Sequence, residues 1–140
     1  MSWASSEHAR RTMKANRRRD TKPELLIRTA LHQKGLRFRV DFPPVKSIRR
    51  RADIVLTRAR IVIFVDGCFW HRCPEHFTLP KTNSKFWKLK IQQNWDRDRD
   101  TDWNFERADW LVLRFWEHED SEKVVATIIE AWRSRLKELG

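Results

Sequence analysis

Hydrophobic positions recur at two different spacings along the chain, and the shorter spacing predicts strands. Two runs of β-branched residues, ADIVLT at 52–57 and IVIFV at 61–65, are separated only by residues 58–60. Such a pair predicts a hairpin in the middle of a sheet. The segment LRFRVDF at 36–42 alternates apolar and basic residues, which is typical of a half-exposed strand. A fourth strand is expected at 110–116, where the sequence reads WLVLRFW.

Helical spacing of the remaining apolar positions predicts three helices around these strands. The first has Thr21 as its expected N-cap and Glu24 three residues on, as in a capping box, and it ends at Gly35. Its expected apolar stripe comprises Leu25, Leu26, Ala30 and Leu31. The other helices are expected at 84–105 and 120–138. The order α-β-β-β-α-β-α predicts an α/β fold with one mixed sheet flanked by helices.

Length and composition favour a folded domain. The chain has 140 residues, of which 40% are hydrophobic, with eight Trp and eight Phe, and this argues against disorder despite 35% charged residues. No segment approaches the roughly 18 apolar residues of a membrane span, and the N-terminal residues lack the apolar stretch of a secretory signal. We therefore expect a cytoplasmic protein. It would consist of a basic arm over 1–20 and one domain over 21–140.

The positive charge is concentrated in one part of the sequence. The net charge is +11, yet residues 1–60 contain 17 Lys or Arg against 5 Asp or Glu, whereas residues 61–140 contain 13 against 14. Arginines cluster at Arg17, Arg18 and Arg19 and again at 49–51. Phosphate backbones are the natural partners of such clusters, which predicts binding to nucleic acid. A solubilising face or a disordered basic tail is the alternative.

The segment DGCFWHRCPEH at 66–76 contains both cysteines of the chain and is rich in potential metal ligands. A structural zinc site takes four thiolate or imidazole ligands in a tetrahedron. The candidate ligands are Cys68, Cys73, His76 and His118, the last of which follows the 110–116 strand. Two buried free cysteines with surface histidines are the alternative.

Two carboxylates stand in or at the end of apolar strands. Asp53 lies inside the 52–57 run and Asp66 directly follows 61–65. Because a carboxylate in such a position loses hydration unless it meets a cation, the pair predicts a Mg²⁺ site that would act on a scissile phosphate. Ion pairing of Asp53 with Arg50 or Arg51 is the alternative.

His71 is the remaining imidazole of the 66–76 segment. If zinc takes the other candidates, His71 is free to act as a general base on water. The alternative makes His71 the fourth zinc ligand in place of His118.

Several stretches resemble the very-short-patch-repair (Vsr) mismatch endonucleases. The resemblance rests on RADIVLTRARIVIFVDGCFWHRCPEH, PKTN at 80–83, FWKLKIQQNWDRD at 86–98 and WLVLRFWEHE at 110–119. It implies a restriction-endonuclease-like core of the PD-(D/E)xK type with a zinc-stabilised loop. It also implies Mg²⁺-dependent nicking of duplex DNA on the 5′ side of the thymine in a T·G mismatch. Such mismatches arise when 5-methylcytosine deaminates, and the nick starts short-patch repair.

The resemblance also implies roles for individual residues. Asp53 matches a metal-binding aspartate, and the Val65 carbonyl falls where the family supplies a further metal ligand. His71 matches the general base, and Glu24 a carboxylate that supports the active site. The best-known member has His where this chain has Asp66, here assigned to metal binding. The four zinc candidates fall at the family's zinc positions, where His118 replaces a cysteine.

DNA contacts are expected from aromatic and polar residues. The resemblance implies that Phe69, Trp70 and Trp87 wedge into the base stack beside the mismatch, where a wobble pair costs less to unstack. Ordinary core packing is the alternative for these aromatics. Further expected contacts are Arg17, Arg18, Arg19, Lys90 and Asn94.

The leading hypothesis is therefore a mismatch-specific nicking endonuclease that acts as a monomer together with other repair proteins. The nearest alternative is a nuclease of the same core with restriction-type or other DNA-structure specificity. A zinc-stabilised DNA-binding protein without catalysis is the third reading, and the combination of Asp53 with His71 argues against it.

Overall fold

The computed structural model describes residues 21–68 and 78–140 as a mixed α/β fold. Its elements are, in chain order, α2 (Lys22–Gln33), β1 (Arg39–Phe42), β2 (Ala52–Leu56), β3 (Ile61–Asp66), α3 (Ser84–Arg107), β4 (Leu111–Trp116) and α4 (Ser121–Leu139). The order α-β-β-β-α-β-α is confirmed. The predicted basic arm over 1–20 lies outside the described residues.

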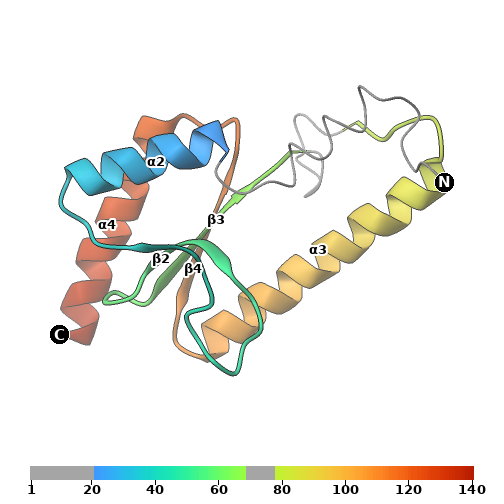
Figure 1. Cartoon of the computed structure of the whole chain (residues 1–140). Coiled ribbons are helices and arrows are strands. Elements are labelled where there is room, and N and C mark those ends of the chain that lie inside the picture. Colours follow the sequence, from blue (N-terminus) through green and yellow to red (C-terminus); the bar gives the residue numbers. More distant parts are fainter. Residues whose placement is uncertain (1–20, 69–77) are drawn as a thin grey trace.

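The four strands form one sheet in the order β1-β2-β3-β4. Strands β1, β2 and β3 pair antiparallel, so the predicted central hairpin is confirmed, whereas β3 and β4 pair parallel. A parallel pair needs a crossover connection, which α3 provides. Helices α2 and α4 cover one face of the sheet and α3 covers the other (Figure 1).

Alternation along the central strands builds a core on each face of the sheet. One face of β2 and β3 packs against α2 and α4, through Ile54, Leu56, Ile61, Ile63, Ile27, Leu31 and Ile128. The other face packs against α3, through Val55, Val62, Phe64 and Phe105. Full burial of each such side chain contributes about 1.5–3 kcal/mol. The central hairpin therefore anchors all three helices, and it fixes the strand ends that carry the candidate site.

Helix α2 buries a different stripe from the one predicted. Ile27 and Leu31 are buried as expected for one helical face, but Leu25 and Leu26 are 45% and 50% exposed. The buried face of the helix begins at Glu24 and continues through Ile27 and Leu31, so Leu25 and Leu26 face away from the sheet. The Glu24 carboxylate pairs with Arg28, four residues on, at 3.4 Å. Thr21 is the N-cap, yet among the described residues its side chain makes no capping hydrogen bond. Thr21 therefore does not make its half of the predicted capping box.

Strand β1 is shorter than the predicted 36–42 segment. Leu36 is buried in the core before the strand starts. Asp41 has a φ of 45°, and the ladder pairs Val40 with Ile54 and Phe42 with Ala52 on either side of it. This left-handed residue twists the strand end, and Asp41 is one of the residue types that tolerate it.

Helix α3 presents a stripe to the sheet that is apolar at both ends and polar in the middle. Trp87 and Ile91 are buried near its start and Phe105 near its end. Between them, the side chains of Asp98 and Asp102 are only 15% and 18% exposed. A partly buried carboxylate needs a cation, and Arg114 of β4 is that cation.

Within the described residues no helix is long and apolar enough to span a membrane.

Candidate active site and zinc site

Asp53 lies where strands β2 and β3 separate. Their ladder ends at the pair formed by Ile54 and Ile63. Beyond it, the Val65 N–H donates to the Asp53 carboxylate oxygen Oδ2 at 2.7 Å. The carboxylate thus takes over a backbone hydrogen bond that the neighbouring strand no longer accepts, and this fixes its position at the edge of the gap.

The Val65 carbonyl points toward the same gap. Along β3, the carbonyls of Arg60 and Asp66 accept from the backbone N–H groups of Leu111 and Glu117, at the β4 side. Because backbone groups alternate sides along a strand, Val65 presents both its N–H and its C=O to the β2 side. Asp53 and the Val65 carbonyl therefore lie on one edge, and both are oxygen donors of the type that Mg²⁺ takes.

The arginines that were the alternative partners of Asp53 contact other groups. Arg50 donates to the Thr101 hydroxyl at 3.0 Å and lies 3.5 Å from Asp100. Arg51 pairs with Asp41 at 3.2 Å and also donates to its backbone carbonyl. These contacts weigh against the reading of Asp53 as an ion-pair partner of either arginine.

Asp66, the other predicted Mg²⁺ ligand, is engaged by a guanidinium. Its side chain is 10% exposed, and its two oxygens lie 3.1 and 3.0 Å from Nη1 of Arg114. This environment favours a structural ion pair, so a direct metal role for Asp66 stays a prediction.

The same arginine joins the sheet to α3. Arg114 Nε donates to the Asp102 carboxylate at 2.8 Å, Nη1 lies 3.8 Å from Asp98, and the guanidinium sits 4.2 Å above the Phe64 ring. Burial lowers the pKa of Arg114, but the nearby carboxylates outweigh it and hold that pKa above its ordinary value. Burial raises the pKa of Asp102 above 3.8, because its cations, Arg114 and Arg99, only partly offset the lost hydration.

Sequence reasoning missed this cluster, although the sequence contains a signal for it. Arg114 interrupts the apolar run WLVLRFW, and α3 repeats Asp at 96, 98, 100 and 102. A lone arginine within an apolar strand needs carboxylate partners. Asp98 and Asp102, four residues apart on one face of the helix, supply them.

Glu24 is buried in the first turn of α2, with 3% of its surface exposed. The Arg28 guanidinium lies 3.4 Å away on the same helix. Figure 1 shows α2 with its N-terminal end on the side of the sheet where β3 ends. A supporting role for Glu24 in the active site stays a prediction.

Two of the four predicted zinc ligands are adjacent. The Sγ of Cys68 lies 3.3 Å from Nδ1 of His118, although the residues are 50 positions apart. The parallel pairing of Asp66 with Trp116 brings the two strand ends together, and His118 follows directly after β4. Zinc–ligand bonds of about 2.0–2.3 Å at a tetrahedral angle place such ligands about 3.6 Å apart, so the observed separation fits a shared ion.

The other predicted ligands lie outside the described residues. Cys73 and His76 belong to the segment 69–77, as do His71, Phe69 and Trp70. Within 21–68 and 78–140, no group of three or more His, Cys, Asp or Glu side chains is arranged to hold a metal. The basic cluster Arg17, Arg18 and Arg19 is likewise outside.

The predicted DNA contacts on α3 have unequal exposure. Trp87 is only 1% exposed and packs edge-on against the Phe86 ring at 5.1 Å, which favours the core-packing alternative for this tryptophan. Lys90 and Asn94 are half-buried. The exposed aromatics of this helix include Trp95 and Trp103, each with an arginine, Arg99 and Arg107, over its ring.

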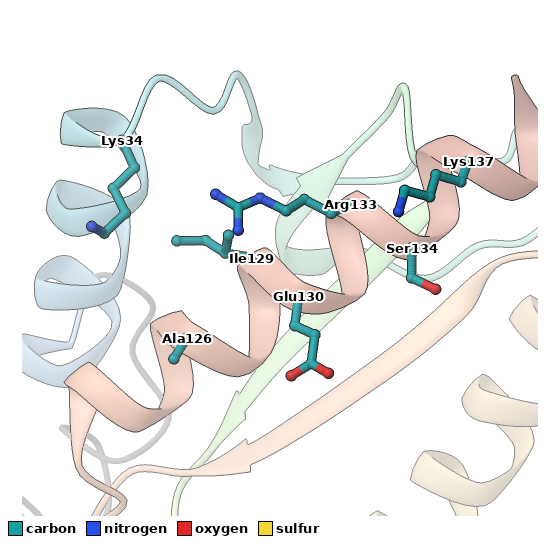
Figure 2. A pocket seen from close by; sticks show the side chains of 7 residues that line it. All are labelled: Lys34, Ala126, Ile129, Glu130, Arg133, Ser134 and Lys137. Atoms are coloured by element: carbon teal, nitrogen blue, oxygen red, sulfur yellow. The ribbon is translucent and has the colours of Figure 1, made fainter.

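An open hollow of about 630 Å³ lies elsewhere, between the end of α2 and the outer face of α4. Figure 2 shows Arg133 of α4 reaching toward α2, with Ile129 beside it, while Lys34 lies at the end of α2. None of the described site candidates lines it. The candidate active site is thus an edge at the ends of two strands, which suits an extended substrate.

Comparison with known proteins gives one consistent family. Residues 4–75 match the family described as DNA mismatch endonuclease Vsr. The chain is 43% identical over 122 residues to the "Type II nicking enzyme V.NaeI" of Lentzea aerocolonigenes, covering 86% of this chain and 74% of the relative. It is 38% identical over 108 residues to the "DNA mismatch endonuclease Vsr" of Escherichia coli, covering 76% and 67%. It is also 36% identical over 109 residues to the "Type II nicking enzyme V.NmeAIP" of Neisseria meningitidis, covering 76% and 75%.

Proposed function

Because the chain belongs to the Vsr family of DNA endonucleases, we propose that it nicks duplex DNA on the 5′ side of the thymine in a T·G mismatch. That it is an endodeoxyribonuclease follows from the family and its relatives. The mismatch specificity and the repair role are the proposal. The observation that carries the reaction is the Asp53 carboxylate beside the Val65 backbone at the open edge of β3.

Asp53 and the Val65 carbonyl would hold the catalytic Mg²⁺. When bound there, the ion lowers the charge barrier to attack on the phosphate and stabilises the leaving oxygen. The protein holds the carboxylate in place through the Val65 N–H, so that it need not reorganise during the reaction. We assign to His71 the removal of the proton from the attacking water.

Cys68 and His118 would hold a structural zinc together with Cys73 and His76. Their separation and their chemistry, one thiol and one imidazole, support this assignment. Such an ion would join the end of β3 to the end of β4 and so fix the start of the 69–77 segment. His71 lies within that segment, so the zinc would act on catalysis through position.

The decisive assay compares synthetic duplexes that differ at one base pair. T·G, other mismatches and matched pairs are incubated with the full chain in Mg²⁺ or in EDTA, and each strand carries its own label. We expect a nick only in the strand with the mismatched thymine, on its 5′ side, and only with Mg²⁺. Equal nicking of matched duplexes would reject the mismatch specificity.

A second candidate function has its own support. Two of the relatives named above are called type II nicking enzymes, so a nicking enzyme with another DNA specificity is the alternative. Random-sequence duplexes with and without cytosine methylation distinguish the two. Cutting at a fixed sequence without any mismatch would select the alternative.

A further inference from the structure

We propose that Arg114 is a positioning residue for the nicking reaction, which fixes the end of β3 against α3. The inference rests on the proposed active site and names a residue outside it. Arg114 contacts neither Asp53 nor Val65 in any hydrogen bond described above. Its partners are Asp66 on β3 and Asp102 on α3.

The end of β3 is short of strand neighbours. Its ladder with β2 stops at Ile63, so from Val65 onward β4 is its neighbour in the sheet. Two side-chain contacts then act on successive residues. Asp53 accepts from the Val65 N–H, and Arg114 holds the carboxylate of Asp66. The strand end is thus restrained both along the sheet and toward α3.

The restraint toward α3 depends on the shape of the guanidinium. Nη1 serves Asp66, while Nε and Nη2 serve Asp102, each about a hydrogen-bond length away. The Phe64 ring under the guanidinium limits its tilt. An ammonium group is a compact point charge and cannot span two carboxylates in this fixed geometry.

What Arg114 adds to the protein is geometry more than stability. Buried ion pairs contribute little net stability compared with apolar packing of the same volume. Misplacement of reacting groups by about 1 Å, in contrast, costs on the order of 100-fold in rate. Because Asp66 directly follows Val65, loss of its anchor moves the Val65 carbonyl relative to Asp53.

The test compares Arg114→Met with a matched control, Arg135→Met. The Arg135 side chain is 13% exposed, against 15% for Arg114. Arg135 donates to the backbone carbonyls of Ala59 and Asp109, which lie at the opposite end of the sheet. Both variants lose a partly buried arginine with hydrogen bonds. The assay measures the single-turnover nicking rate at saturating DNA and Mg²⁺, normalised to the folded fraction.

We expect Arg114→Met to lower this rate about 100-fold, whereas Arg135→Met stays within about twofold of the parent chain. DNA binding in EDTA should change by less than about threefold in both variants, because Arg114 lies below the surface. Equal rates for the two variants would overturn the proposal.

Two further variants keep the test decisive if Arg114→Met folds poorly. Arg114→Lys retains the charge but loses the planar set of guanidinium donors that reaches both carboxylates. We expect the nicking rate to fall by about tenfold or more. A full rate for Arg114→Lys would overturn the proposal. In the double variant Arg114→Met with Asp66→Asn, the rate should be no lower than in the slower single variant, since both changes remove one anchor. A double loss equal to the product of the single losses would mean that Arg114 does not act through Asp66.

The test does not depend on mismatch specificity. The rates are compared on whichever duplex the parent chain nicks. If the unsubstituted chain nicks matched and mismatched duplexes equally, the proposed specificity is rejected. The comparison of the Arg114 and Arg135 variants can still be made. A parent chain that selects T·G, with Arg114→Met equal to Arg135→Met, rejects the positioning role alone.

Discussion

At the scale of single residues, the structure separates two carboxylates that the sequence made equivalent. Both Asp53 and Asp66 adjoin apolar strands, and each was a predicted Mg²⁺ ligand. Asp53 accepts a backbone hydrogen bond at an open strand edge, whereas Asp66 lies in a guanidinium cluster. Their partners decide the difference, and Arg114 is 48 residues from Asp66, too far for a local pattern to pair them.

Asp53→Asn tests the carboxylate while keeping its shape. Asparagine can still accept from the Val65 N–H, so the fold should persist, but the charge that attracts Mg²⁺ is lost. A bound ion supplies several kcal/mol at the transition state, so we expect nicking to fall by at least about 100-fold. Asp100→Asn, an exposed carboxylate on α3, is the control. Normal nicking by Asp53→Asn would place the metal elsewhere.

Asp102 should give the protein a measurable dependence of stability on pH. Its pKa is raised in the folded state, so the folded chain holds this proton to a higher pH than the unfolded chain does. The stabilisation is complete below the ordinary value of 3.8 and is lost as pH rises through the raised pKa. We expect the difference in unfolding free energy between the parent chain and Asp102→Asn to fall with pH in this window. Urea unfolding at a series of pH values measures it, and a flat difference would contradict the raised pKa.

At the scale of elements, periodicity predicted the order of helices and strands but not which faces they bury. The hairpin of β2 and β3 was readable because both strands are rich in β-branched apolar residues and only a short turn separates them. The buried stripe of α2 was misassigned because Leu25 and Leu26 were expected to face inward on account of their apolar side chains. In the structure both are exposed, and Glu24 is buried in the first turn. The start of β1 was also misplaced, because the predicted segment begins at Leu36, which is buried in the core, whereas the strand begins at Arg39. Its end at Phe42 was right, although the left-handed φ of Asp41 within it is a property of the backbone that alternation does not encode.

The zinc assignment joins two elements and can be tested at His118. We expect His118→Ala to lower the zinc content of the purified protein and its melting temperature, because metal binding contributes to folding energy. His32→Ala, an exposed histidine on α2, is the control. His71→Ala should keep zinc and lose nicking. The reverse pattern, zinc lost with His71 and kept without His118, would exchange the two roles.

At the scale of the whole molecule, the relevant features are the distribution of positive charge and the strand edge that carries the candidate active site. The net charge of +11 is carried by the first 60 residues, and the candidate active site stands on an open strand edge rather than in the hollow between α2 and α4. A basic chain with an open site suits a long polyanion. The sequence predicted this partner from charge alone, whereas the location of the edge required the register of the strands.

The salt dependence of DNA binding should show whether the basic cluster Arg17, Arg18 and Arg19 contacts phosphates. Each phosphate contact contributes about −0.9 to the slope of log K against log salt for duplex DNA. We expect the variant with Arg17, Arg18 and Arg19 all replaced by Ala to reduce the magnitude of that slope by about 2 to 3. A charge-matched control replaces Lys34, Arg133 and Lys137, which line the hollow, and should change the slope less. Equal slopes for both variants would show that only total charge matters.

The pairing of Cys68 with His118 has a consequence for how the chain is made. The contact bridges 50 residues and exists only once β4 has added to the edge of β3. During synthesis, Cys68 leaves the ribosome long before His118, and the contacts of longest sequence separation are the slowest to form. Cys68 therefore has no His118 beside it until the C-terminal part of the chain has been synthesised. Completion of this pair is a late event, so the end of the sheet that carries the candidate active site is assembled only after β4 has been made.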